Sequence, residues 1–377
     1  MKTALGLMSG TSMDGIDAAI IRTDGKIVKN TGHFISIPYE QEVRDILLHA
    51  VTTKDKKDAS EAEREITIAH ANVVQTLLEK SGLSKSDIDV IGFHGHTIDH
   101  NRGKKFTWQI GDGKLLAKLT GIDVVNDFRS SDVKGGGQGA PLVPLYHAAL
   151  VHDQEKPIAL LNIGGVANVT YIGKGHGARD MGEGKKSHVP YSLSHTPYIL
   201  AFDTGPGNAM IDDWVFKHIG EYFDKDGEVS GKGVVDKEVL KNLLSNPYFS
   251  EKPPKSLDRN NFSPDLISHL SLEDGAATLA AFTAASVAEG CKHFPDEPKN
   301  WYVTGGGRYN RRIMQELEGR LIRKVQNIEV LGFNGDALEA EAFAFLAVRT
   351  LRKLPISLPS TTGVKKSLVT GGVFCPA

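Results

Sequence analysis

The sequence predicts an α/β protein built from two related domains, and a repeated hairpin pattern is the main reason. Apolar residues 4–8 and 16–21 flank a loop rich in Gly, Ser, Thr and Asp. The same design recurs at residues 159–163 and 166–172, which flank Gly164 and Gly165. Two apolar runs joined by such a turn are typical of a β-hairpin. Two similar openings in one chain predict a duplicated α/β domain with a cleft between the copies.

The composition is that of an ordinary globular protein. The chain has 377 residues, with 44 Lys+Arg against 46 Asp+Glu, so the formal net charge is −2. This length favours two domains. Near-neutral charge argues against a general nucleic-acid binder, which needs a basic face. The only two cysteines, Cys291 and Cys375, form no disulfide or zinc framework. No apolar stretch is long enough for a membrane helix or a signal peptide, and we expect a cytoplasmic protein without membrane partners.

Helical periodicity is clearest after Asn208, where Ile211, Trp214, Val215 and Ile219 share one face. Residues 236–244 and 338–351 are also predicted to be helical, and residues 276–288 are predicted to form a buried helix. Residues 174–195 are polar and show no period, so we expect a mobile surface loop there.

Glycine is the outlier of the composition, at 40 residues, and much of it lies in loops after apolar runs. Glycine lets a ligand approach backbone N–H groups closely, and several such loops facing one cleft would make an anion or nucleotide site. The alternative for each loop is a simple tight turn. Neither the P-loop pattern G-x-x-x-x-G-K-[ST] nor the dinucleotide fingerprint G-x-G-x-x-G occurs. A nucleotide site must therefore use another design.

Motifs spread over nearly the whole chain resemble those of the anhydro-N-acetylmuramic acid kinases. The opening signature is the segment from Gly6 to Asp17, GLMSGTSMDGID. Further motifs, in the expected order, are HGHT at 94–97, QIGDG at 109–113, NDFR at 126–129, GGQGAPLVP at 136–144, NIGGVAN at 162–168, FDTGPGN at 202–208, PPKS at 253–256, GGGRYN at 305–310 and LEA at 338–340.

The resemblance implies the actin/hexokinase/heat-shock-70 type of fold, in which two related domains close on ATP. We place the first domain at residues 1–137 plus 358–377 and the second at residues 138–357. The implied reaction converts 1,6-anhydro-N-acetylmuramate, ATP and water to N-acetylmuramate 6-phosphate and ADP during peptidoglycan recycling. The homologous levoglucosan kinases treat an anhydroglucose in the same way. The family also implies a homodimer.

The resemblance assigns candidate residues one by one. The ATP phosphate segment matches Gly10, Thr11, Ser12, Met13, Asp14, Gly15, Ile16 and Asp17, and further nucleotide-facing positions are Gly164, Gly165, Gly305, Gly306, Gly307 and Asn310. Sugar-holding positions are His94, Thr97, Arg129 and Glu339. Magnesium takes oxygen ligands and keeps several waters, so Asp14 or Asp17 could hold Mg²⁺ through water.

Asp203 is the candidate general base, which would take a proton from the water attacking the anomeric carbon. Its alternative is a capping aspartate at a helix N-terminus. An arginine fork at Arg129 suits the lactyl carboxylate of a muramic acid; the alternative is a structural arginine. Glu339 could simply be a first-turn acid. His94 and His96 are expected on one face of a strand. With His100 they are alternative candidates for metal ligands, although a sugar-pocket role is favoured.

Two classes of function compete. The first is an ATP-dependent anhydrosugar kinase, acting on anhydromuramate or on levoglucosan or another small sugar. The second is an actin-like protein that uses nucleotide to control assembly. The combination of Asp203, Arg129 and Glu339 favours the enzyme, because a nucleotide switch needs no sugar pocket.

Overall fold

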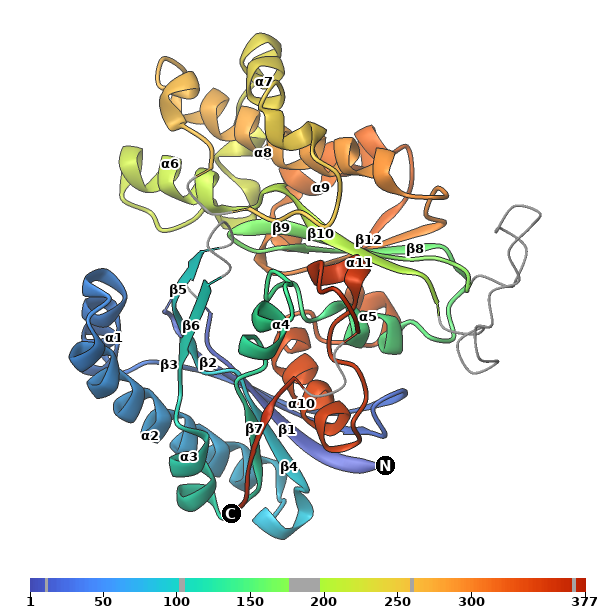
Figure 1. Cartoon of the computed structure of the whole chain (residues 1–377). Helices are drawn as coiled ribbons and strands as arrows, with labels where there is room; N and C mark the ends of the chain where they lie inside the picture. Colours follow the sequence, from blue (N-terminus) through green and yellow to red (C-terminus); the bar gives the residue numbers. More distant parts are fainter. Residues whose placement is uncertain (11–12, 102–105, 176–196, 258–260, 368–370) are drawn as a thin grey trace. The chain divides into compact units, whose positions relative to one another are not determined.

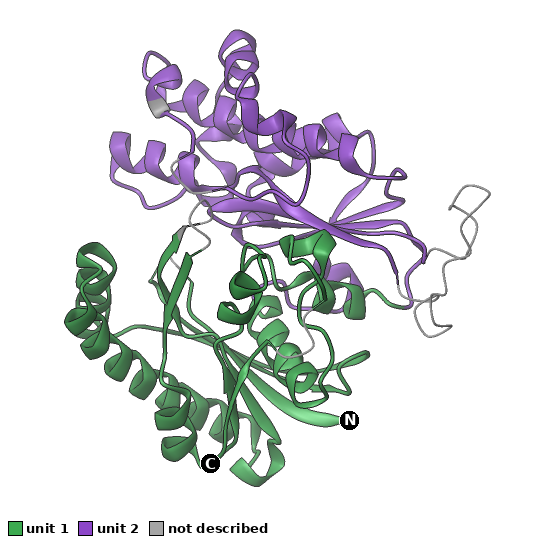
Figure 2. Ribbon diagram, in the orientation of Figure 1, with its two compact units in different colours: residues 1–152, 337–377 green, residues 153–336 purple. Residues whose placement is uncertain are grey.

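The computed structural model describes all residues except 11–12, 102–105, 176–196, 258–260 and 368–370 (Figure 1). The chain forms two compact units (Figure 2). Unit 1 comprises residues 1–152 and 337–377, and unit 2 comprises residues 153–336. The loop expected at 174–195 falls almost entirely outside the described residues.

Unit 1 is built on a six-stranded sheet with the order β13-β7-β4-β1-β2-β3. Its strands are β1 (Lys2–Met8), β2 (Gly15–Thr23), β3 (Val28–Pro38), β4 (Val90–Phe93), β7 (Val124–Asn126) and β13 (Val373–Cys375), while β5 (His96–Asn101) and β6 (Phe106–Ile110) pair separately. Its helices are α1 (Gln41–Thr53), α2 (Lys56–Ser81), α3 (Gly113–Thr120), α4 (Ser130–Lys134), α5 (Pro144–Leu150), α10 (Leu338–Leu351) and α11 (Pro359–Thr362).

The two faces of this sheet are covered differently. Leu5 and Leu7 of β1 pack with Ile66 and Val73 of α2 in one apolar core. On the other face α10 lies against β1, β2 and β4 (Figure 1).

A glycine pair lets α10 approach the sheet backbone directly. Gly6 of β1 and Gly92 of β4 are neighbours in the parallel register. A Cβ on Gly6 would lie 1.7 Å from the carbonyl oxygen of Ala340, and one on Gly92 would lie 2.1 Å from that of Phe343. No side chain fits at either position, so the two glycines allow the helix that carries Glu339 to pack directly against the strand backbones.

Unit 2 is built on a five-stranded sheet with the order β10-β9-β8-β11-β12. Its strands are β8 (Ile158–Ile163), β9 (Val166–Ile172), β10 (Ile199–Pro206), β11 (Asn300–Thr304) and β12 (Val325–Asn327), and its α-helices are α6 (Ala209–Ile219), α7 (Lys237–Leu244), α8 (Leu272–Gly290) and α9 (Arg311–Leu321).

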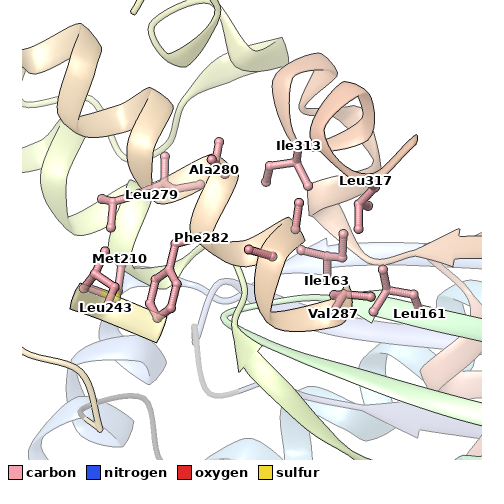
Figure 3. Close-up of a cluster of buried hydrophobic side chains, with 14 of the residues drawn as sticks. Leu161, Ile163, Met210, Leu243, Leu279, Ala280, Phe282, Val287, Ile313 and Leu317 are labelled. Carbon is pink, nitrogen blue, oxygen red and sulfur yellow. The ribbon is translucent and has the colours of Figure 1, made fainter. Parts of the chain in front are cut away.

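The core of unit 2 lies between its sheet and these helices. Leu161 and Ile163 of β8 lie beside Val287 of α8 in a buried cluster that also contains Phe282 of the same helix (Figure 3). α8 is buried over most of its length, as expected for a helix rich in alanine and apolar on all sides. The predicted buried helix is therefore confirmed, and so are the helices after Asn208 and at 338–351.

The two sheets share one topology. In unit 1, β1, β2 and β3 form an antiparallel meander, and β4 and β7 add in parallel on the other side of β1. In unit 2, β8, β9 and β10 form the meander, and β11 and β12 add in parallel beside β8. Both predicted hairpins are present, as β1–β2 and β8–β9. The duplication implied by the actin/hexokinase/heat-shock-70 type of fold is thereby confirmed.

The limits of the units differ from the domain limits that we expected at residues 137/138 and 357/358. Residues 138–152, which include α5, and residues 337–357, which include α10, lie in unit 1. The reason is packing: α10 covers the first sheet, and α5 packs against α10. Within the described residues no helix is both long enough and apolar enough to span a bilayer.

Candidate active site

The glycine loop after β1 returns directly into β2. Met8 and Asp17 are opposite each other in the antiparallel pair, so the ends of the loop meet at one place. Within the loop the Met13 amide donates to the Gly10 carbonyl at 3.1 Å, and Asp14 is exposed. Gly15, Ile16 and Asp17 already belong to β2. The candidates Thr11 and Ser12 lie outside the described residues.

Tyr39, which follows β3, contacts both ends of this loop. Its hydroxyl donates to Ser9 Oγ at 2.8 Å, and its backbone amide donates to the Asp14 carbonyl at 3.2 Å. Ser9 Oγ lies 3.0 Å from His96 Nδ1. Ser9 Oγ therefore links the Tyr39 hydroxyl to the His96 ring. Burial lowers the pKa of His96 to about 4, so the ring is neutral.

Arg129 and His94 form the centre of the sugar-holding candidates. His94 Nδ1 lies 2.9 Å from the Gly95 carbonyl oxygen, an acceptor only, so Nδ1 carries the proton. Nε2 therefore accepts from Arg129 Nε at 3.0 Å. Burial and then the Arg129 charge hold the pKa of His94 well below its usual value. The expectation that His94 and His96 share a strand is wrong, because β4 ends at Phe93 and β5 begins at His96.

The other side of Arg129 is held by the glycine loop at 135–139. Arg129 Nη1 donates to the Gly139 carbonyl at 2.6 Å. The Gly139 amide in turn donates to Asp132 Oδ1 at 2.7 Å, and Thr362 Oγ1 donates to Asp132 Oδ2 at 2.6 Å. Asp132 is fully buried. The buried Asp132 therefore holds the glycine loop, and the loop in turn holds the Arg129 side chain.

Glu339 lies in the first turn of α10 and is exposed. Surrounding protein atoms desolvate the carboxyl and raise its pKa; the Arg129 charge lowers it and the Asp17 charge raises it. Glu339, Arg129 and Asp17 are therefore close enough to interact electrostatically. Thr97, on β5, accepts a hydrogen bond from Gln109 at 3.3 Å. Three of the four sugar candidates, His94, Arg129 and Glu339, therefore interact in unit 1, and the Asp17 charge acts on Glu339 as well. The fourth candidate, Thr97, is not part of this group.

In unit 2, Asp203 lies in a row of polar residues that crosses the sheet. Asp203 of β10 is opposite Asn168 of β9, Asn168 is opposite Asn162 of β8, and Asn162 is opposite Thr304 of β11. Directly opposite residues of neighbouring strands point to the same face. The row lies near the carboxyl ends of the parallel strands β8, β10 and β11, which is where open α/β sheets place ligands.

Asp203 is 8% exposed and is held by several contacts. The Leu257 amide donates to its Oδ2 at 2.7 Å, its own amide donates to the Lys255 carbonyl at 3.1 Å, and the Tyr248 hydroxyl donates to its carbonyl. The helix-capping alternative is wrong, because α6 has Asn208 at its N-cap and β10 runs on to Pro206.

The turn of Gly164 and Gly165 meets the start of α6. The Gly164 carbonyl accepts from the Asn208 amide at 2.7 Å, and the Gly165 carbonyl accepts from the amides of Gly207 and Ala209 at 3.0 and 3.2 Å. These carbonyls satisfy N–H groups that a helix start leaves unpaired. The turn is therefore tied to the segment that follows Asp203.

The segment from Gly305 to Asn310 connects β11 to α9. Gly305 lies beside Asn162 of the polar row, because a Cβ on Gly305 would be 2.4 Å from Asn162 Oδ1. Gly306 and Gly307 begin a short turn of helix. Asn310 is buried; its Oδ1 accepts from the amides of Arg312 and Ile313, and its Nδ2 donates to Asp224 at 3.1 Å. Asn310 thus caps α9.

No cluster of three or more His, Cys, Asp or Glu side chains suited to a metal is found among the described residues. This removes the alternative in which His94, His96 and His100 bind a metal. Asp14, in the loop after β1, and Asp17, in β2, offer carboxylate oxygens of the kind that a magnesium ion accepts directly or through its waters.

Several residues of these networks have no role predicted from the sequence, among them Ser9, Tyr39, Tyr248 and Lys255. Ser9 and Lys255 stand in the family motifs, which was the available signal. Tyr39 and Tyr248 carry no local pattern, since their contacts join segments 30 and 45 residues apart.

Comparison with known proteins identifies the family. The family model "Anhydro-N-acetylmuramic acid kinase" matches residues 2–186 and 192–376. Proteins of that name are 48% identical over 363 residues in Paramagnetospirillum magneticum, covering 96% of each chain, and 46% identical over 377 residues in Rhodospirillum rubrum, covering 99% of this chain and 94% of the relative. A third, from Gluconobacter oxydans, is 46% identical over 380 residues, covering 98% of this chain and 99% of the relative. The chain belongs to the anhydro-N-acetylmuramic acid kinase family.

Proposed function

We propose that the enzyme uses ATP and water to open the 1,6-anhydro ring of 1,6-anhydro-N-acetylmuramic acid and to phosphorylate O6. Family membership over the whole chain supports this reaction. The observation that carries the proposal is the buried Asp203, held by backbone contacts near the carboxyl end of its strand, in a chain whose Arg129 is held by His94 and acts electrostatically on Glu339.

Asp203 acts as the general base in this proposal. It accepts a proton from water as the water oxygen forms a bond to the anomeric carbon. The bond from that carbon to O6 breaks, and O6 attacks the γ-phosphorus of ATP. The bond from phosphorus to the bridging oxygen breaks, and ADP leaves. Phosphoryl transfer of this kind depends mainly on positioning and charge stabilisation.

The remaining candidates bind and orient the substrates. Arg129 binds the lactyl carboxylate, whose geometry suits a planar guanidinium. Glu339 accepts a hydrogen bond from a sugar hydroxyl. The loop from Gly10 to Asp17 and the segment from Gly305 to Asn310 contact ATP. Asp14 and Asp17 would hold Mg²⁺ through water, and the ion would neutralise phosphate charge. We also propose that the enzyme is a cytoplasmic homodimer, as its family resemblance implies.

An ADP-release assay over a panel of sugars tests the proposal. The panel contains 1,6-anhydro-N-acetylmuramic acid, levoglucosan, N-acetylglucosamine and glucose. We expect the highest kcat/KM on the anhydromuramate, with N-acetylmuramate 6-phosphate as product. Equal or greater activity on levoglucosan would contradict the assigned substrate, and activity on none of the four with ATP bound would contradict the reaction.

A further inference from the structure

Asp203 belongs to a closed ring of three hydrogen bonds in unit 2. The Asp203 amide donates to the Lys255 carbonyl at 3.1 Å. Lys255 Nζ donates to the Tyr248 carbonyl at 3.0 Å, and the Tyr248 hydroxyl donates back to the Asp203 carbonyl. Each residue gives one donor and one carbonyl, so the position of each depends on the other two.

Lys255 is an unusual member of such a ring, because it is a cation with only 5% of its surface exposed. Its Nζ lies 4.3 Å from the centre of the Tyr248 ring and 5.8 Å from that of Phe202. These aromatic faces and the Tyr248 carbonyl offset part of the cost of removing the charge from water. A shorter apolar side chain would avoid that cost, but it would leave the ring open.

The charged groups that act on Lys255 do not neutralise it. Burial, and after it the Lys292 charge, lower the pKa of Lys255 to about 8, while Glu251 and Glu289 act in the opposite direction. Lys255 also contributes to lowering the pKa of His293. Among the described residues Lys255 forms no ion pair, and its Nζ is instead held by the Tyr248 carbonyl of the ring.

The segment that carries Lys255 also reaches the Asp203 carboxylate. Leu257, two positions further on, donates its amide to Oδ2 at 2.7 Å. The main chain of Asp203 and one of its carboxylate oxygens are thus held by the same short stretch of chain. Anything that moves this stretch turns the carboxylate.

We infer that Lys255 is a positioning residue for Asp203, which acts through the ring with Tyr248 to fix the direction of the base. The inference rests on the proposed role of Asp203 as general base. Lys255 itself is assigned no contact with the substrates. Its loss would therefore affect turnover far more than binding, since small displacements of a reacting group reduce rate steeply.

The test compares Lys255→Met with Lys156→Met. Lys156 is a matched control in the same unit, because its Nζ also donates to a backbone carbonyl, that of Gln154, at 2.8 Å. We expect Lys255→Met to lower kcat by roughly 10–100-fold, with the KM values for ATP and the anhydrosugar within about 3-fold of wild type. Lys156→Met should leave all three constants nearly unchanged.

Two further readouts separate positioning from a general loss of structure. In Lys255→Met the acidic limb of the kcat–pH profile should move to higher pH. The reason is that the Leu257 amide, which stabilises the charged Asp203 carboxylate by donating to it, would be positioned less well. In an Asp203→Asn background, Lys255→Met should cost less than 3-fold, because the base through which it acts is already gone. A kcat within 2-fold of wild type, or equal losses with and without Asp203, would overturn the inference.

Tyr248→Phe keeps the experiment decisive if Lys255→Met does not fold. That variant removes only the hydroxyl that closes the ring, and it should give the same pattern at smaller amplitude, about 3–10-fold in kcat. Unchanged kcat in a folded Tyr248→Phe would also overturn the inference. The proposed function fails separately, if the wild-type enzyme releases no ADP or if Asp203→Asn is as active as wild type.

Discussion

Arg129 donates from Nε to Nε2 of His94 at 3.0 Å, and this bond requires the histidine to be neutral. Protonated histidine has no acceptor nitrogen, so a charged ring would repel the guanidinium and release it. Burial and the arginine itself keep the pKa of His94 low. The pair therefore fixes the direction of the arginine throughout the neutral pH range.

Arg129→Ala should discriminate between substrates. If the guanidinium receives the lactyl carboxylate, its loss removes a charge-assisted contact that is worth about 2 kcal/mol, or roughly 30-fold in kcat/KM for anhydromuramate. Levoglucosan has no carboxylate, and its kcat/KM should change by less than about 3-fold. Arg44→Ala, at an exposed position, is the control. Equal losses on both sugars would indicate a structural arginine.

His94→Phe should weaken anhydromuramate binding without removing the arginine. The phenyl ring retains the packing against Phe343, whose ring centre lies 4.5 Å from that of His94. It removes the acceptor for Arg129, so the guanidinium loses one of its supports. We expect the KM for anhydromuramate to rise by roughly 10-fold, with the KM for ATP unchanged. Steady-state kinetics with both substrates varied measures this, and an unchanged anhydromuramate KM would contradict the support role.

Asp203→Asn should separate chemistry from binding. The amide keeps the shape of the carboxylate but cannot accept the proton of the attacking water. We expect kcat to fall by roughly 10²-fold or more. ATP affinity, measured by calorimetry, should stay near the wild-type value. Near-wild-type turnover in this variant would remove Asp203 from the role of base.

Tyr39→Phe should weaken the link between Tyr39 and Ser9. The hydroxyl that reaches Ser9 is lost, while the backbone contact to Asp14 remains. We expect the free energy of unfolding to fall by about 1 kcal/mol and the KM for ATP to rise several-fold. Tyr222→Phe, at a residue 77% exposed, is the matched control. A loss of stability with an unchanged ATP KM would show that Tyr39 only supports the fold.

Glu341→Gln should change how stability depends on pH. Glu341 is 2% exposed and accepts from the Tyr146 hydroxyl, and burial raises its pKa from 4.5 to about 7. The folded protein thus holds this proton more tightly than the unfolded chain does. The stabilisation that the protonated group provides is complete below pH 4.5 and is lost as the pH rises through 7.

The neutral amide of Glu341→Gln has no such dependence. Its free energy of unfolding relative to wild type should therefore rise by roughly 2–3 kcal/mol between pH 5 and pH 8. Urea denaturation at the two pH values measures this difference. Glu42→Gln, at an exposed position, should show no comparable change, and a parallel shift in both variants would contradict the assignment to Glu341.

The local elements of the fold could be predicted because each leaves a pattern in its own segment. The hairpin at β8–β9 shows as two apolar runs around Gly164 and Gly165, and α10 shows as an apolar stretch bounded as predicted at 338–351. The unit to which α10 belongs could not be predicted in this way. It depends on the fit of the helix over Gly6 and Gly92, whose partners lie about 250–335 residues away along the chain.

Of the candidate site, the sequence motifs could predict only which residues take part. The motifs gave Asp203 and Arg129, but not what holds them. The carbonyl of Gly95 determines the neutral tautomer of His94, and contacts with Tyr248 and Lys255 fix the main chain of Asp203. Such contacts depend on tertiary packing between distant segments, and no periodicity or composition records them.

The interruption of unit 1 by unit 2 has a consequence for synthesis on the ribosome. Unit 2 is one continuous stretch, residues 153–336, whereas unit 1 lacks α10 and β13 until the last 41 residues emerge. Domains generally fold as units during synthesis, so we expect the half that carries Asp203 to complete its core first. Unit 1, which carries Arg129, stays incomplete until α10 has been synthesised and can cover Gly6 and Gly92. We therefore expect the group of sugar candidates that includes Glu339 to form last.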